Sequence, residues 1–111
     1  MTIYNTKNLL NQVLPAAGRI MALDVGQKRI GIAITDESRF LSSPKDILTR
    51  RSNERDFEKI ADFIKTHKIL AIIIGLPLNM DDSESEMSKF VRKFSENLDN
   101  FLKKGNSNDV L

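Results

Sequence analysis

The sequence predicts an α/β domain in which helices flank a mixed β-sheet, with the order strand, strand, strand, helix, strand, helix. Two observations support this class. Short apolar runs bounded by glycine-containing or polar connections recur before residue 50 and again at residues 69–74, as is typical of strands. Residues 53–67 and 83–104 instead repeat their apolar side chains with a helical period.

The N-terminal segment has a different pattern. Residues 6–14 carry apolar side chains at near-helical spacing, and Pro15 and Gly18 interrupt it. We therefore expect a helical extension over residues 1–18, without a functional signal. The main domain is expected to span residues 19–104, followed by a polar tail at residues 105–111.

The first two strands are predicted at residues 19–24 and 29–35, joined in a hairpin through Gly26. A weaker third strand is predicted at residues 44–49, where Pro44 suits a strand start or a sheet edge. Asp46 within it should point away from the core. Because the connections are short, these three strands should be antiparallel neighbours.

The two long helices are predicted from their apolar stripes. In the first, Asn53 is expected to be the N-cap residue. In the second, Ser83 and Glu86 match the capping-box pattern, and Gly105 should end the helix. Its expected buried stripe comprises Met87, Phe90, Val91, Phe94, Leu98, Phe101 and Leu102.

The run at residues 69–74 is apolar without alternation, as is typical of a central strand in a parallel arrangement. A right-handed crossover through the first long helix would place this strand parallel to the first one. The carboxyl ends of both strands would then meet, with Asp24 beside Gly75, Leu76 and Pro77. Ligands bind at such strand ends in open α/β sheets.

Composition narrows the class of protein. A chain of 111 residues makes one domain, and the lack of cysteine excludes disulfides and thiolate zinc sites. The lack of cysteine suits a reducing cytoplasm, which is where we expect the protein. The longest apolar run, residues 69–78, is too short to cross a bilayer, so we expect no membrane partner. Residues 1–55 hold nine Lys and Arg against five Asp and Glu. This excess suits a polyanion such as nucleic acid, although a random surface imbalance explains it equally well.

Asp24 is the most unusual residue, because carboxylates are depleted in strands. At a strand end, it could hold a metal ion against a phosphate, with Gly26 keeping the backbone clear and Lys28 and Arg29 neutralising a nucleic-acid backbone. The plainer alternative is that Asp24 hydrogen-bonds its own turn.

A two-metal phosphodiesterase needs more than one carboxylate. Asp36, Asp81 and Asp82 are the candidates for the further ligands, and each is also a typical turn residue.

Two stretches, Leu23–Asp36 and Ile73–Asp81, closely resemble the two motifs of the YqgF/RuvX family. The resemblance implies an RNase H-like fold and a nuclease, described either as a Holliday junction resolvase or as the enzyme that matures the 5′ end of pre-16S rRNA. It implies that Asp24 is the first catalytic, metal-binding aspartate, with Mg²⁺ or Mn²⁺ as cofactor. It also implies that Gly75 and Pro77 line the same substrate cleft.

The chain departs from this family after the last predicted helix. Family members usually continue with a strand that ends in Asp-Glu-Arg and then a helix with a further acid, and these acids have no counterpart here. A C-terminal truncation of this kind would leave residues 69–74 as an exposed sheet edge.

Four functions therefore remain open. They are a metal-dependent nuclease acting on structured RNA in ribosome biogenesis, a resolvase acting on branched DNA, a catalytically inactive remnant, and a phosphate-binding module of the actin and sugar-kinase type. The last also uses an Asp-x-Gly hairpin, but this chain is short for its adenosine site. The sequence predicts no oligomeric state.

Overall fold

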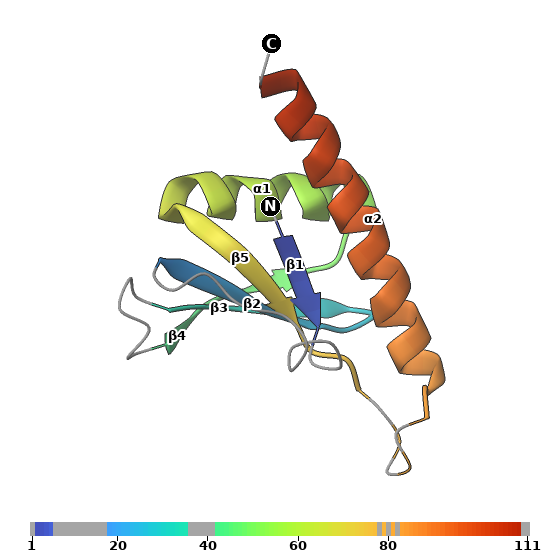
Figure 1. Ribbon diagram of the computed structural model, residues 1–111. Helices are drawn as coiled ribbons and strands as arrows, with labels where there is room; N and C mark the ends of the chain where they lie inside the picture. The colour runs from blue at the N-terminus through green and yellow to red at the C-terminus, as the bar shows by residue number, and fades with distance from the viewer. Residues whose placement is uncertain are drawn as a thin grey trace.

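A computed structural model describes residues 2–5, 18–35, 42–77, 79, 81 and 83–109. Five strands form one mixed sheet, and two helices lie over one of its faces (Figure 1). In chain order the elements are β1 (Thr2–Asn5), β2 (Arg19–Val25), β3 (Arg29–Thr35), β4 (Ser42–Thr49), α1 (Asn53–His67), β5 (Ile69–Ile74) and α2 (Glu86–Asp109). The predicted α/β class with an RNase H-like mixed sheet is confirmed.

The strands are ordered β1-β5-β2-β3-β4 across the sheet. β2, β3 and β4 are antiparallel neighbours, and β5 runs parallel to β2, as predicted. β4 begins at Ser42, two residues before the predicted start. Pro44 therefore lies inside β4, where the edge position and a shift of register between Ile32 and Ala33 accommodate it.

α1 has the predicted bounds, but its N-cap is Ser52 and not Asn53. The Ser52 hydroxyl accepts a hydrogen bond from the Arg55 backbone N–H at 3.3 Å. Both residue types cap helices well, so the type of residue alone could not decide between the two positions. The helix ends at Lys68, whose left-handed φ of 54° lets its N–H bond to the Ile64 carbonyl.

Both predicted ends of α2 are wrong. The N-cap is Ser85, whose hydroxyl accepts the Ser88 N–H at 3.1 Å, while Ser83 bonds to Asp81 instead. The helix also continues through Gly105 to Asp109. A single glycine costs a helix only about 1 kcal/mol, so it does not have to terminate one.

β1 is a strand of the main sheet, so the expectation of a helical extension over residues 1–18 is wrong at residues 2–5. Its four residues pair parallel to β5, from Thr2 opposite Ala71 to Asn5 opposite Ile74. The expectation of an exposed edge at β5 is therefore wrong over this stretch. Four residues are too few for a periodic pattern to be recognised. The predicted helix at residues 6–14 lies outside the described residues.

The core lies between the sheet and the two helices. Met21, Leu23 and Val25 of β2 point into it, where they meet Phe57 of α1 and Phe94 of α2. The other face of the sheet, called the second face below, carries the alternate residues. On this face Ile20, Ala71 and Ile73 form a small separate cluster.

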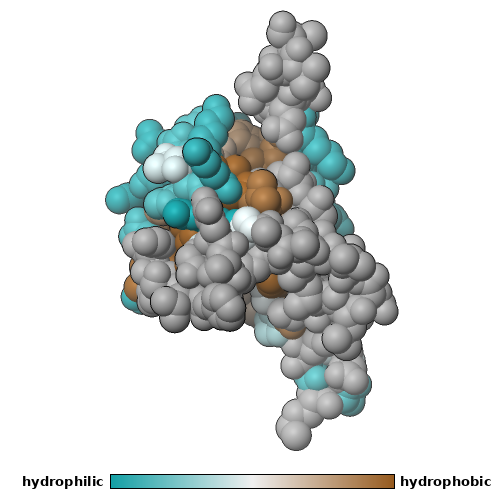
Figure 2. Space-filling model, turned by 60° about the vertical axis from the view of Figure 1, so that its left-hand side comes forward, coloured by the Kyte–Doolittle hydropathy of each residue, from teal (hydrophilic) through white to brown (hydrophobic). Residues whose placement is uncertain are grey.

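Hydrophobic side chains also reach the surface, where brown areas interrupt the hydrophilic surface in Figure 2. Among the described large hydrophobic residues, Ile47 is 66% exposed and Leu70 is 51% exposed. Within the described part of the chain, neither α1 nor α2 has the length and apolar composition needed to cross a membrane.

Candidate functional site

Asp24 lies next to the end of β2, and the alternation of the strand turns its side chain to the second face. Its neighbours Leu23 and Val25 are buried in the core, whereas Asp24 is exposed. Asp24 pairs across the hairpin with Gly31. A Cβ atom on Gly31 would lie 3.6 Å from the Asp24 Cβ atom. Glycine at this position therefore leaves space directly beside the carboxylate.

The carboxyl end of β5 reaches the same place. Ile74 lies opposite Leu23, and the Gly75 N–H donates to the Leu23 carbonyl at 3.3 Å. The bend at Gly75–Pro77 therefore begins beside Asp24, as the predicted parallel pairing requires.

Two hollows adjoin Asp24. The first, of about 500 Å³, has a floor on the second face, and the second, of about 430 Å³, lies against the bend after β5. Asp24 and Gly75 line both. The first is also lined by Ala22, Leu23, Gly31, Ile32, Ala33, Asp46, Ile47 and Ile73, and the second by Val25, Leu76, Pro77 and Met87. Asp24 thus lies between a mostly apolar floor and a proline-containing bend, and Asp46 is a second acid in the lining of the first hollow.

The Asp24 carboxylate makes no hydrogen bond or ion pair with any described residue. The alternative in which it bonds its own turn is therefore not observed among these residues. No described residue occupies its oxygens, and Mg²⁺ typically uses one or two protein carboxylates together with water and substrate phosphate. The site fits one carboxylate ligand of such an ion.

A second metal ligand is harder to find. Asp46 lines the first hollow, but its Oδ1 atom already accepts the Ile47 N–H at 2.8 Å. The described part of the chain contains no group of three or more His, Cys, Asp or Glu residues that could hold a metal ion. These residues do not by themselves make a two-metal centre.

Of the three further acids named from the sequence, Asp36 and Asp82 lie outside the described residues. Asp81 is exposed and forms a local turn, accepting the Ser83 hydroxyl at 2.6 Å and the Ser83 N–H at 3.1 Å. Both hydrogen bonds lower the pKa of the Asp81 carboxyl, and the bond from the Ser83 hydroxyl has the larger effect. Asp81 lines neither hollow beside Asp24, so its position is that of a turn residue.

Gly26, Lys28 and Arg29 belong to the hairpin turn that follows Asp24. The Gly26 N–H donates to the Arg29 carbonyl at 2.8 Å, and a Cβ atom on Gly26 would lie only 2.9 Å from that oxygen. Glycine is therefore required by the closeness of the backbone. Lys28 and Arg29 are exposed, and neither hollow has them among its described lining residues. The structure places these cations on the turn after Asp24, outside the described lining of both hollows.

Arg50 and Asp56 form a pair that the sequence analysis missed. The Arg50 Nε atom lies 2.8 Å from Asp56 Oδ2, and the Asp56 side chain is 1% exposed. Asp56 precedes Ile60 by four residues, so both lie on the buried face of α1. A carboxylate on a buried helix face requires a partner, and this signal could have pointed to Arg50.

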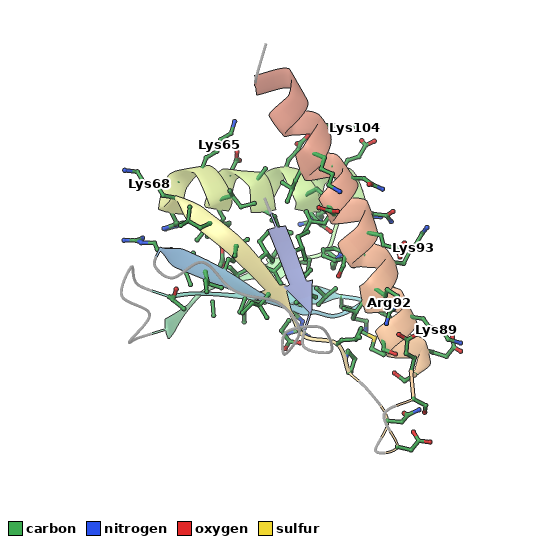
Figure 3. The ribbon with its side chains drawn as sticks, in the orientation of Figure 1. Lys65, Lys68, Lys89, Arg92, Lys93 and Lys104 are labelled. Carbon is green, nitrogen blue, oxygen red and sulfur yellow. The ribbon has the colours of Figure 1, made fainter. Side chains whose placement is uncertain are left out.

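Other cations lie away from Asp24. Lys65 and Lys68 project at the C-terminal end of α1, and Lys89 and Lys93 point away from the sheet along α2 (Figure 3). Lys89 pairs with Glu86, and Arg92 pairs with Glu84. The α2 surface therefore carries both signs of charge.

Comparison with known proteins gives consistent matches. Residues 18–106 match a family model described as "RuvX: Holliday junction resolvase". Three similar proteins bear the name "Putative pre-16S rRNA nuclease". They come from Zymomonas mobilis (37% identical over 81% of this chain), a Sulfurihydrogenibium species (42% over 76%) and Endomicrobium trichonymphae (45% over 72%). The matched parts are 55%, 57% and 57% of those proteins, so this chain spans just over half of their length.

Proposed function

Because the chain belongs to the RuvX family of Holliday junction resolvases, we propose that it is a metal-dependent nuclease that hydrolyses phosphodiester bonds in nucleic acid. The observation that carries the proposal is the position of Asp24. Its carboxylate is exposed, has no partner among the described residues, and lies where the ends of β2 and β5 meet. Such strand ends bind ligands in α/β sheets.

Each part of the site has a distinct task in this proposal. Asp24 holds a divalent cation, Mg²⁺ or Mn²⁺, which when bound stabilises negative charge on phosphate oxygens and makes a bound water acidic. Gly31 keeps the space beside Asp24 clear for a phosphodiester backbone. Lys28 and Arg29, exposed on the adjoining turn, bind phosphates on either side of the reacting one.

The substrate we propose is the 5′ end of pre-16S rRNA, by analogy with the names of the similar proteins. Such a role belongs in the cytoplasm. The description of the matching family favours a second substrate, a four-way DNA junction. Both substrates present closely spaced phosphates, so they differ in shape rather than in the chemistry that Asp24 must supply.

The test is a cleavage assay with both substrates, a precursor RNA and a DNA junction, each with and without Mg²⁺. We expect cleavage that requires the metal and that Asp24→Asn reduces to the metal-free level, because the amide removes the charge of the ligand. Asp62→Asn is the matched control, since it makes the same chemical change on an exposed residue of α1 and should cleave like the wild type.

Cleavage that survives Asp24→Asn would refute the assignment of Asp24. If the wild type cleaves neither the precursor RNA nor the DNA junction, the nuclease proposal for this chain is refuted. It would then favour the inactive form considered from the sequence.

A further inference from the structure

We propose that Arg50 is the positioning residue of the site, holding the Asp24–Gly26 backbone in the geometry that lets Asp24 bind a divalent cation. This inference rests on the proposed function. Arg50 follows the end of β4, and its guanidinium carbon lies 5.0 Å from the centre of the Phe94 ring and 5.7 Å from that of Phe90. Arg50 is thus fixed between the turn after Asp24 and α2.

The guanidinium group uses each of its nitrogens on a different partner. Nε donates to Asp56 at 2.8 Å, Nη2 donates to the Asn53 side chain at 2.7 Å, and Nη1 donates to the Gly26 carbonyl at 3.4 Å. The Arg50 backbone N–H also donates to the Lys28 carbonyl at 2.9 Å. Arg50 therefore contacts the turn at two points, one on each side of Gln27.

The contact with Gly26 is long for a hydrogen bond and would be weak alone. Its importance comes from the other partners, which fix the guanidinium before it reaches the turn. The Arg50 side chain is 14% exposed and Asp56 is 1% exposed, so the pair is screened little by solvent. Gly26 then has both backbone polar groups bonded, its N–H to Arg29 and its C=O to Arg50.

The connection to the site is short. Gly26 is two residues after Asp24. Met87 lines the second hollow with Asp24, and it lies one turn before Phe90 and two turns before Phe94 on α2. Arg50 therefore links the turn that follows the carboxylate with the helix that forms another wall of its hollow. Lysine would retain the charge but offers one nitrogen in place of a planar fork, so it cannot bond Asp56, Asn53 and Gly26 in this arrangement.

The test compares Arg50→Lys with Arg51→Lys and uses two measurements. Arg51 is exposed, and its contact with Asp56 is made by its backbone N–H, which survives the substitution. In metal-free protein, hydrogen exchange of the Gly26 amide should accelerate about 10-fold or more in Arg50→Lys, beyond any change at the Ile72 amide of the core. In a Mn²⁺ titration followed by broadening of the Gly31 amide signal, affinity should fall by about 10- to 100-fold in Arg50→Lys. Arg51→Lys should match the wild type in both.

Arg50→Lys that leaves either Gly26 exchange or Mn²⁺ affinity unchanged would overturn the proposal, because a positioning role requires both to move. Equal acceleration at Gly26 and Ile72 would also overturn it, since it would indicate general destabilisation only. Failure of the proposed function looks different. The wild type would then show no Mn²⁺ broadening at Gly31, while the exchange measurement would still report whether Arg50 holds the turn.

Discussion

Replacing Asp56 with alanine should lower the free energy of unfolding by about 3 kcal/mol, because the carboxylate is buried and satisfies two donors. Its bond to the Arg50 guanidinium, at 2.8 Å, is charge-assisted, and hydrogen bonds to charged groups contribute about 1.5–3 kcal/mol. Its bond to the Arg51 N–H, at 3.2 Å, is of the ordinary kind, which contributes about 1 kcal/mol.

The cost should lie at the lower end of the range of about 3–5 kcal/mol that is typical when one partner of a buried ion pair is removed. After the substitution, the Arg50 guanidinium still contacts the Phe90 and Phe94 rings, and its side chain is 14% exposed. The two rings and the solvent therefore continue to stabilise its charge. In a domain of 111 residues, a loss of this size corresponds to a melting temperature lower by roughly 12 °C.

Urea unfolding followed by circular dichroism would give the free energy, with a thermal scan as a second measurement. Lys89→Ala is the matched control, since it removes an ion pair with Glu86 whose side chains are 62% and 94% exposed. Exposed pairs of this kind contribute at most about 0.5 kcal/mol. An Asp56→Ala loss no larger than that of Lys89→Ala would refute the reasoning. So would additive losses in the Arg50→Ala/Asp56→Ala double variant, because residues in contact should be coupled.

Two further predictions concern β1 and the Asp81 turn. Ile3→Asp should detach β1 from the core and expose the edge of β5, so the variant should self-associate at lower concentrations than the wild type in sedimentation velocity; unchanged sedimentation would contradict this. Ser83→Ala should raise the pKa of Asp81 in an NMR titration, because the Ser83 hydroxyl is the main cause of its lowering. A lowered pKa stabilises the folded state at pH values above the ordinary pKa of the carboxyl, and this contribution is lost as the pH falls through the lowered pKa. Because Asp81 is fully exposed, Ser83→Ala should barely change the free energy of unfolding at any pH.

The elements that the sequence predicted well are those whose side chains repeat over several turns or alternations. The bounds of α1, β3 and β5 agree with the prediction because their apolar residues reveal a face or a buried run. The elements predicted poorly depend on contacts distant in sequence or on competition between similar residues. β1 has four residues and exists through its pairing with β5, about seventy positions away. The caps Ser52 and Ser85 each had a neighbouring residue that was equally suitable by type.

The same distinction applies to the site. The predicted meeting of Asp24 with the bend after β5 followed from two local rules, the parallel crossover and the position of the acid at a strand end. The arrangement around Arg50 could not follow from such rules. It requires residues 26, 53, 56, 90 and 94 to meet, and these come from a turn and two helices. The sequence offers one indication of this arrangement. Asp56 falls on the apolar face of the predicted helix, and a carboxylate on such a face needs a cation nearby.

The alternation of β2 separates the requirements of stability from those of chemistry within one strand. Met21, Leu23 and Val25 are at most 4% exposed and pack under the helices, so the position of the strand is fixed from that side. The second face is then free to carry small residues around Asp24, with Gly31 opposite it. A carboxylate that binds a cation can also accept hydrogen bonds, but no described residue bonds to the Asp24 carboxylate. Among the described residues, the position of Asp24 is therefore set through the backbone, and the contacts of Arg50 with the adjoining turn contribute to that constraint from the covered side of the sheet.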